Sequence, residues 1–454
     1  MGGGKWIYLG IITLLSIIII IQYNGISIKG KKYYQIKHRP PIVSLIKNAK
    51  QYIKDEARFA QMQLNGYVFL QDKIFEGKLP YKNKSNIKSP NVIVLFMEGT
   101  SARLLESYGG KFKNLTPNIS EFANSAHSLL IKNYYNHTAA TFSGTHGTIA
   151  SCYPHGEGNW YNKNATAIIS NRIYQTLPNI LNNYNYDTIF VSPHKKDDGY
   201  TALLKMLKFK KVKTLDDRIS QYPTTQIHHN SLQDNDMYEW IKEILANHQN
   251  SNPLLLSAYL FETHTGIDTP KNGVKYSIDN PVLNTLHNQD KAFGEFWQWF
   301  KDSKYAKNTI IVLTADHAHY YDNYFVPLVK EQSDYKEIFV DRIPLIIYDP
   351  IHNLPKNLDA NGRTSLDLTP TILHLLDIQN ERNSFLGKSL FEKSHNLNIA
   401  AIGGDFYLIH NKVVYKENEI DNLDMSIKKA FQKRKDEIEL FYFAERKNKV
   451  FFEK

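Results

Sequence analysis

The segment 136–154 (NHTAATFSGTHGTIASCYP) combines hydroxyl side chains with small residues in one short stretch. Thr141 stands directly before residues at which a helix can begin. A hydroxyl at a helix amino terminus faces unsatisfied N–H groups and the positive end of the helix dipole. A metal ion beside it would favour the alkoxide and make it a nucleophile. Thr138 and Thr145 compete for this role, and an ordinary capping threonine is the alternative interpretation of the segment taken alone.

Acidic and histidine side chains follow three strongly apolar runs. Glu98 follows 91–97 (NVIVLFM), the pair Asp316-His317 comes just after 309–314 (TIIVLT), and His264 comes soon after 254–260 (LLLSAYL). A carboxylate that leaves a buried segment is costly unless it is paired or holds a metal. An adjacent Asp and His offer one hard oxygen and one imidazole nitrogen, which suits Zn²⁺ or Mn²⁺. Any one of these residues is more often a satisfied polar group, but three together predict a site.

The apolar runs also predict the fold. Unalternating runs rich in β-branched residues are typical of strands buried on both faces, and they recur at 91–97, 188–192, 254–260, 309–314 and 344–348. Helical patterns lie between them, notably at 237–247, 283–300 and 366–376. We therefore expect an α/β fold with a mainly parallel central sheet and helices on both faces. In such sheets the functional residues usually lie at the carboxyl ends of the strands, and the candidate residues are found there.

Composition restricts the classes of partner. The chain has 454 residues, of which 42% are hydrophobic, as expected for a globular protein with a real core. Its formal charge of +10 suits a membrane surface, an anionic substrate or nucleic acid. Because the sequence has no zinc-finger spacing and no dense arginine patch, we do not expect nucleic-acid binding. Cys152 is the only cysteine, so an intramolecular disulfide is impossible.

The amino terminus predicts a membrane anchor. The stretch 6–23 (WIYLGIITLLSIIIIIQY) has 18 residues without a charge, near the minimum of roughly 17 that spans a bilayer. No small-x-small cleavage site follows it, which favours an uncleaved helix. We expect residues 1–23 to form the anchor, 24–88 a basic juxtamembrane linker with a helix near 41–67, and 89–454 the catalytic domain with a peripheral carboxy-terminal helix. Basic residues cluster after the anchor, a bias that alone would keep the domain in the cytoplasm.

Taken in order, these segments resemble the alkaline phosphatase/sulfatase superfamily. Within it they resemble the envelope transferases, which include lipoteichoic acid synthases, phosphoethanolamine transferases and glucan phosphoglycerol transferases. The resemblance runs from about residue 91 to residue 390. It is carried by the opening strand with Glu98, Thr-Pro-Asn at 116–118, the segment 141–144 followed by Ser151-Cys152, Asp-His at 316–317, D-x-x-P-T at 367–371 and G-x-S-L at 387–390.

The resemblance implies a set of site residues. Glu98, Thr141, Asp316 and His317 would hold one divalent metal, Zn²⁺ or Mn²⁺, and Thr141 would form a phospho-threonine. His264 would contact the substrate phosphate or move the proton of the leaving group. Three further histidines are expected to bind substrate: His137, His194 and His319.

The resemblance also implies partners and a location. The donor would be a phospholipid and the acceptor an envelope glycan. The enzyme would be a single-pass protein of a bacterial inner membrane with its catalytic domain outside the cytoplasm, against the charge bias. A metal-dependent phosphodiesterase or phosphatase, or a sulfatase-like hydrolase of the same fold, is the alternative. A non-catalytic assembly protein is disfavoured because all four ligands are present.

Two departures from related patterns narrow the expected chemistry. Sulfate-ester hydrolysis is not expected, because 152–156 (CYPHG) lacks the arginine of the formylglycine motif C-x-P-x-R. The Trp-Asn-Arg element of lipoteichoic acid synthases is replaced by 197–200 (DDGY), which argues against their phosphoglycerol specificity.

Overall fold

The computed structural model describes residues 68–154, 172–248, 251–393 and 397–452, together with isolated helical positions between residues 45 and 57. The chain divides into two units, residues 1–65 and 66–454. The expected anchor at 6–23 and most of the expected helix at 41–67 lie outside the described residues. Among the residues that are described, no helix is long and apolar enough to cross a membrane.

The segment 68–88 belongs to the larger unit rather than to a linker. Its backbone forms isolated bridges from Gln71 to Asn383 and from Asn83 to His352. Gln71 N–H donates to the Asn383 carbonyl at 2.8 Å, and the Asn383 N–H donates back at 2.9 Å. The larger unit therefore begins before the boundary that the sequence suggested at residue 89, because a polar, lysine-rich segment can still pair its backbone with a folded domain.

An eight-stranded sheet forms the centre of the larger unit, in the order β10-β2-β9-β8-β1-β7-β3-β4. Its strands are β1 (Asn91–Met97), β2 (Ser128–Lys132), β3 (Asp187–Val191), β4 (Lys211–Lys213), β7 (Leu254–Leu260), β8 (Thr309–Ala315), β9 (Leu345–Tyr348) and β10 (Asn357–Asp359). Only β9 runs antiparallel to its neighbours, β8 and β2. All five apolar runs are strands, which confirms the expected α/β fold with a mainly parallel sheet.

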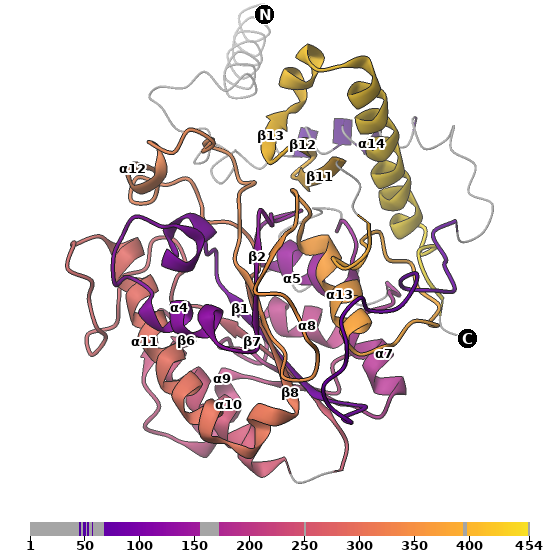
Figure 1. Ribbon diagram of the computed structural model, residues 1–454. Helices are drawn as coiled ribbons and strands as arrows, with labels where there is room; N and C mark the ends of the chain where they lie inside the picture. Colours follow the sequence, from indigo (N-terminus) through magenta and orange to yellow (C-terminus); the bar gives the residue numbers. More distant parts are fainter. Residues whose placement is uncertain are drawn as a thin grey trace, which may run out of the picture. The chain divides into compact units, whose positions relative to one another are not determined.

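Helices cover both faces of this sheet (Figure 1). On one face α11 packs against α4 and α10, and on the other α5 packs against α7, α8 and α13. The helices are α4 (Pro117–Asn124), α5 (Thr141–Ala150), α7 (Leu177–Asn183), α8 (Gly199–Met206), α9 (Leu215–Gln221), α10 (Asp234–Asn247), α11 (Pro281–Asp302), α12 (Val326–Val329), α13 (Leu368–Leu375) and α14 (Met425–Arg446). The predicted helical patterns correspond to α10, α11 and α13.

Short elements connect these layers. The 3₁₀ helices are η1 (Ala102–Leu104), η2 (Glu106–Tyr108), η3 (Lys304–Lys307), η4 (Ser365–Asp367) and η5 (Glu417–Asn422), and a small hairpin joins β5 (Ile227–His228) to β6 (Ser231–Leu232). The central strands are apolar because both of their faces are covered, and from Val92 to Met97 no residue of β1 is more than 2% exposed. α11 begins where the Asn280 side chain accepts the N–H groups of Val282 and Leu283.

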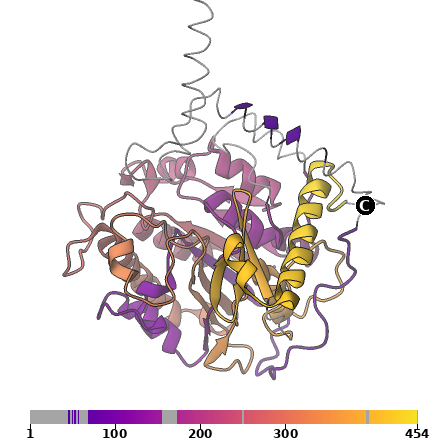
Figure 2. The ribbon, with the colours of Figure 1, turned by 90° about the horizontal axis from the view of Figure 1, so that it is seen from above.

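A three-stranded antiparallel sheet and the long helix α14 lie at the carboxy-terminal end of the chain (Figure 2). The strands are β11 (Leu397–Ile402), β12 (Asp405–His410) and β13 (Val413–Lys416), and α14 contacts β11. This region packs against the hydroxyl-rich segment 136–154 and forms hydrogen bonds with it. Tyr153 Oη donates to the Ile399 carbonyl, and Ala401 N–H donates to the His137 carbonyl, both at 2.8 Å. The expected carboxy-terminal helix is thus present.

Candidate active site

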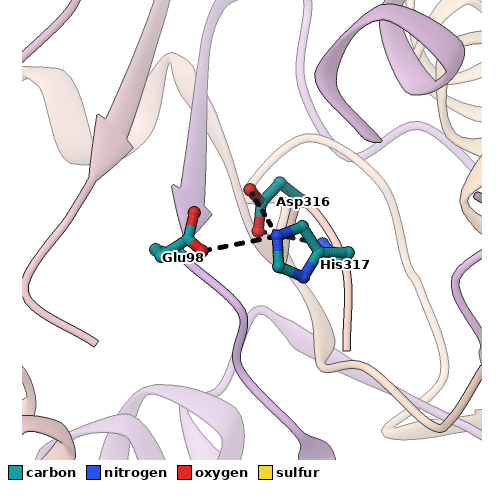
Figure 3. A group of neighbouring side chains, drawn as sticks. All are labelled: Glu98, Asp316 and His317. Carbon is teal, nitrogen blue, oxygen red and sulfur yellow. Dashed lines mark hydrogen bonds and ion pairs between the residues drawn. The ribbon is translucent and has the colours of Figure 1, made fainter. Parts of the chain in front are cut away.

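Three ionisable side chains converge at the carboxyl ends of two neighbouring strands. β1 and β8 pair in parallel along their whole length, so Glu98 and Asp316 leave the sheet side by side. Gly99 N–H donates to Asp316 Oδ1 at 2.9 Å and ties the two turns together. Ligand atoms of Glu98, Asp316 and His317 all lie within 4.8 Å of one another (Figure 3). All three side chains are completely buried.

The hydrogen bonds of His317 decide which ring nitrogen faces this cluster. Its Nδ1 lies 2.7 Å from the carbonyl oxygen of Ala318 and must donate, because a carbonyl only accepts. In the neutral ring Nε2 then carries the lone pair. Nε2 lies 3.3 Å from Glu98 Oε1 and 3.5 Å from Asp316 Oδ2. His317 is therefore oriented to bind a metal through Nε2.

The charges of the cluster influence one another strongly. Burial alone would raise the pKa of Glu98, but the neighbouring His317 outweighs it, so the Glu98 pKa is lowered. Burial, reinforced by the charge of Glu98, raises the pKa of Asp316 well above its usual range. Burial alone would lower the pKa of His317, but Asp316 and Glu98 raise it to about 9. In the absence of a cation the cluster holds protons, and metal binding would release them.

Two carboxylate oxygens of the cluster, Glu98 Oε1 and Asp316 Oδ2, have no hydrogen-bond partner among the described residues. Both lie near His317 Nε2. Buried anionic oxygens are costly unless a donor or a cation satisfies them. Two hard oxygens and one imidazole nitrogen are ligands that Zn²⁺ and Mn²⁺ accept. The residues present therefore fit one divalent metal.

Thr141 lies against the same cluster. It is the first residue of α5, and its Oγ1 donates to Glu98 Oε2 at 2.9 Å. The same oxygen is 3.5 Å from His317 Nε2. Ala140, the N-cap residue of α5, has no side chain that could accept the first N–H groups of the helix, and such groups are suited to binding an anion. The structure thus brings together all four residues that were expected to hold the metal.

Gly144 lets α5 approach the turn that follows β8. A Cβ at this position would lie 2.3 Å from the carbonyl oxygen of Asp316, so only glycine fits without displacing backbone. A competing hydroxyl has another partner, because Thr145 Oγ1 lies 3.0 Å from Tyr200 Oη. Of the three candidate threonines, Thr141 is the one whose hydroxyl donates to Glu98.

Tyr259 is a site residue that sequence reasoning missed. It lies on β7 opposite Phe96 of β1, and it is only 1% exposed. Its hydroxyl donates a hydrogen bond to Glu98 Oε2 and lies 3.5 Å from Thr141 Oγ1. Burial and the charge of Glu98 raise its pKa, so it remains a donor at neutral pH. The sequence hid it inside an apolar run, where a tyrosine is normally a core residue.

Two of the expected substrate-binding histidines flank Phe261, just after β7. The His194 ring lies 4.9 Å from the Phe261 ring and 5.6 Å from the Tyr259 ring, and its Nδ1 is 3.0 Å from Ser231 Oγ. The His264 ring also lies near Phe261, at 5.0 Å, and its Nδ1 donates to the Thr265 carbonyl at 2.8 Å. Both rings thus belong to an aromatic cluster that reaches Glu98 through Tyr259.

His319 follows the Asp-His pair and is buried. Its Nδ1 donates to the Tyr320 carbonyl at 2.8 Å, and its ring stacks on Phe325 at 4.6 Å. Nε2 has no hydrogen-bond partner among the described residues. A role of His319 in substrate binding stays a prediction.

His137 departs from its expected role. It is fully buried, with Nδ1 2.7 Å from Ser365 Oγ and Nε2 2.9 Å from the Cys152 carbonyl. Its ring also meets the edge of Tyr153. Both ring nitrogens are therefore occupied by protein, and the expectation that His137 contacts substrate is replaced by a structural role beneath α5. The sequence placed His137 in the hydroxyl-rich segment but could not show which way its ring turns.

Comparisons with known sequences extend over this region. A sequence model of the family described as Sulfatase matches residues 90–378. Lipoteichoic acid synthase 1 of Bacillus subtilis is 30% identical over 152 residues, which cover 32% of this chain and 22% of the synthase. Lipoteichoic acid synthase 2 of the same organism is 26% identical over 144 residues, 31% of this chain and again 22% of the synthase. The matched part thus spans about a fifth of the length of either relative.

Comparisons with solved structures cover more of the chain. A protein of the alkaline phosphatase superfamily from Vibrio parahaemolyticus has a TM-score of 0.65 at 17% identity, covering 90% of this chain and 98% of that one. The lipoteichoic acid synthase LtaP from Listeria monocytogenes has a TM-score of 0.66 at 18% identity, covering 82% of this chain and 98% of that one. At these identities the likeness demonstrates a common fold.

Proposed function

The chain belongs to the sulfatase family, and from this premise we propose that it is a metal-dependent transferase that moves a phospho-group from a phospholipid to a cell-envelope glycan. One observation carries the proposal. The Thr141 hydroxyl stands at the start of α5, bonded to Glu98 at 2.9 Å and 3.5 Å from His317 Nε2. A hydroxyl held against metal ligands at a helix amino terminus suits covalent catalysis on phosphorus.

Glu98, Thr141, Asp316 and His317 are the residues that would hold the metal. A bound divalent ion would lower the pKa of the Thr141 hydroxyl and would offset negative charge on the phosphoryl oxygens. The proton of Thr141 already has an acceptor, because Thr141 Oγ1 donates to Glu98 Oε2 at 2.9 Å. The uncapped N–H groups of α5 would contribute further donors to the phosphoryl oxygens.

The proposed reaction consists of two displacements at phosphorus. In the first, Thr141 Oγ1 attacks the head-group phosphorus, the bond to the glycerol oxygen breaks, and diacylglycerol leaves with a proton. In the second, a glycan hydroxyl attacks the phospho-threonine, the bond between phosphorus and Oγ1 breaks, and Thr141 regains its proton. His264 is proposed to deliver and remove these protons. Its Nδ1 is fixed by the Thr265 carbonyl, so the neutral ring offers Nε2 as the base.

The substrates and the location are part of the proposal. A phospholipid donor and a glycan acceptor are supported by the resemblance to relatives named as lipoteichoic acid synthases. The uncharged stretch 6–23 supports a single-pass protein of a bacterial inner membrane, with the catalytic unit outside the cytoplasm. An anchor would confine the enzyme to the surface that carries its lipid donor.

The test uses the purified full chain in detergent with Mn²⁺ or Zn²⁺ and mixed micelles of phosphatidylglycerol or phosphatidylethanolamine. The expected result is release of diacylglycerol together with a phosphoglycerol or phosphoethanolamine adduct on Thr141 in the peptide mass spectrum. Thr141→Ala should abolish both, and the matched variant Thr138→Ala should retain both. An adduct on another residue, or undiminished lipid turnover by Thr141→Ala, would refute the proposal. Turnover that needs no glycan and yields the free head-group phosphate would establish the phosphodiesterase alternative instead.

A further inference from the structure

The two oxygens of the Glu98 carboxylate face different groups. Oε1 lies 3.3 Å from His317 Nε2 and has no hydrogen-bond partner among the described residues. Oε2 accepts a hydrogen bond from Thr141 Oγ1 at 2.9 Å. One oxygen is thus free for a metal while the other holds the nucleophile. Rotation of the Glu98 carboxylate would exchange its two oxygens. If both oxygens bound the metal, the Thr141 hydroxyl would lose its hydrogen-bond acceptor.

The Tyr259 hydroxyl is the other donor to Oε2, and it lies 3.5 Å from Thr141 Oγ1. It therefore contacts the two groups whose relative position decides whether the nucleophile is formed. The phenol cannot easily move away. Its ring packs 5.3 Å from the Tyr200 ring and 5.6 Å from the His194 ring, and β7 pairs on both sides, with β1 and β3.

Burial defines how Tyr259 can act. Its side chain is 1% exposed and comes from β7, a central strand of the sheet. A tyrosine hydroxyl in such a place needs a hydrogen-bond partner, and here both partners are proposed catalytic groups. Because it is shielded from solvent, it would act through Glu98 and Thr141 rather than by contact with the lipid or the glycan.

We propose that Tyr259 is a positioning residue for the metal and the nucleophile: it fixes Glu98 with one oxygen toward the metal and the other toward Thr141. The inference rests on the proposed function and adds a group to it that the sequence did not reveal. Hydrogen-bond partners of metal ligands commonly change metal affinity or activity by about 10–100-fold when they are removed. Tyr259 should have an effect of this size although it is not itself a ligand.

The test compares Tyr259→Phe with Tyr200→Phe in the full chain. Each variant removes one buried hydroxyl from the same aromatic cluster, but the Tyr200 hydroxyl bonds to Thr145 rather than to Glu98 or Thr141. Mn²⁺ affinity of the metal-free proteins is measured by calorimetry. Turnover of bis(p-nitrophenyl) phosphate is then measured at saturating Mn²⁺. Tyr259→Phe should bind Mn²⁺ about 10-fold more weakly and lower kcat by about 10–100-fold with little change in KM.

Tyr200→Phe should match the wild type in both measurements. Equal Mn²⁺ affinity and equal kcat in Tyr259→Phe and the wild type would overturn the inference, as would equal losses in the two variants. The calorimetric measurement needs no substrate, so the role of Tyr259 is tested even if the chain does not act on lipids. Failure of the proposed function would instead appear as undiminished turnover by Thr141→Ala.

Discussion

Replacing Gly144 by alanine tests whether the proposed nucleophile, Thr141, depends on the close approach of α5 to the proposed metal ligands. The added Cβ would lie 2.3 Å from the carbonyl oxygen of Asp316 and 2.9 Å from its carbonyl carbon. The clash is between the backbone of α5 and the backbone of the turn after β8, and neither can move as easily as a flexible side chain. To reach an ordinary contact distance, α5 and the turn after β8 must separate by about 1 Å. Thr141 begins this helix and would move with it.

The expected effect on activity is larger than the effect on stability. A misplacement of about 1 Å in a catalytic group can lower the rate about 100-fold. Crowding in a packed site costs about 1–3 kcal/mol, but alanine is favoured over glycine in a helix by about 1 kcal/mol. The net loss in the free energy of unfolding should therefore be at most about 2 kcal/mol. We expect a folded protein with kcat reduced about 100-fold and weakened Mn²⁺ binding.

Gly147→Ala is the matched control, because it crowds the same helix away from Asp316. Its Cβ would lie 2.4 Å from His137 Nε2 and 2.8 Å from the Cys152 carbonyl oxygen. Both variants are assayed by chemical denaturation, by calorimetry with Mn²⁺ and by turnover of bis(p-nitrophenyl) phosphate. Gly147→Ala should lose stability with a smaller loss of kcat and unchanged Mn²⁺ affinity. Wild-type kcat and Mn²⁺ affinity in Gly144→Ala would refute the packing argument.

Three further predictions concern the metal ligands and the groups beneath α5. Asp316→Asn should bind Mn²⁺ far more weakly in calorimetry, yet the metal-free variant should have a higher Tm than the metal-free wild type. Burial and the charge of Glu98 both disfavour the ionised carboxylate of Asp316, and the amide removes this cost. A lower Tm of the metal-free variant would contradict this. Burial raises the pKa of the Cys152 thiol well above its usual range, so iodoacetamide at pH 8 should leave the folded protein unmodified, and intact mass should show an unconverted cysteine. Burial lowers the pKa of His137 to about 4. The neutral His137 side chain therefore contributes stability that is fully present above the unfolded-state pKa and is lost as the pH falls toward 4. The loss in the free energy of unfolding is about 3 kcal/mol. Denaturation curves of His137→Asn should accordingly depend less on pH between 6.5 and 4 than those of the wild type.

The sequence predicted the fold because strands buried on both faces must be apolar throughout. The five runs stood out for this reason, and the carboxyl ends of parallel strands meet at one edge, so the convergence of Glu98 with the Asp316-His317 pair followed. The antiparallel direction of β9 was not predictable, since an apolar run looks the same in either direction. Contacts of the segment 68–88 with the sheet domain were also missed, because its buried side chains, such as Phe75, which stacks on His374, stand singly in a polar, lysine-rich sequence.

The side chains that sequence reasoning misjudged are those whose role depends on direction. Tyr259 lies in an apolar strand, and only the pairing of β7 with β1 reveals that its hydroxyl reaches Glu98. His137 lies in the hydroxyl-rich segment, but its ring turns toward Ser365 and the Cys152 carbonyl. Position along the chain locates a residue near a site, whereas packing of the surrounding elements decides which way the side chain points.

The most direct measurement is anomalous diffraction at the manganese edge from crystals of the protein soaked with Mn²⁺. We expect one peak that lies against Glu98, Thr141, Asp316 and His317, whose side chains already converge. A peak elsewhere, or a peak bound by Glu98, Asp316 and His317 with Thr141 Oγ1 out of reach, would contradict this expectation.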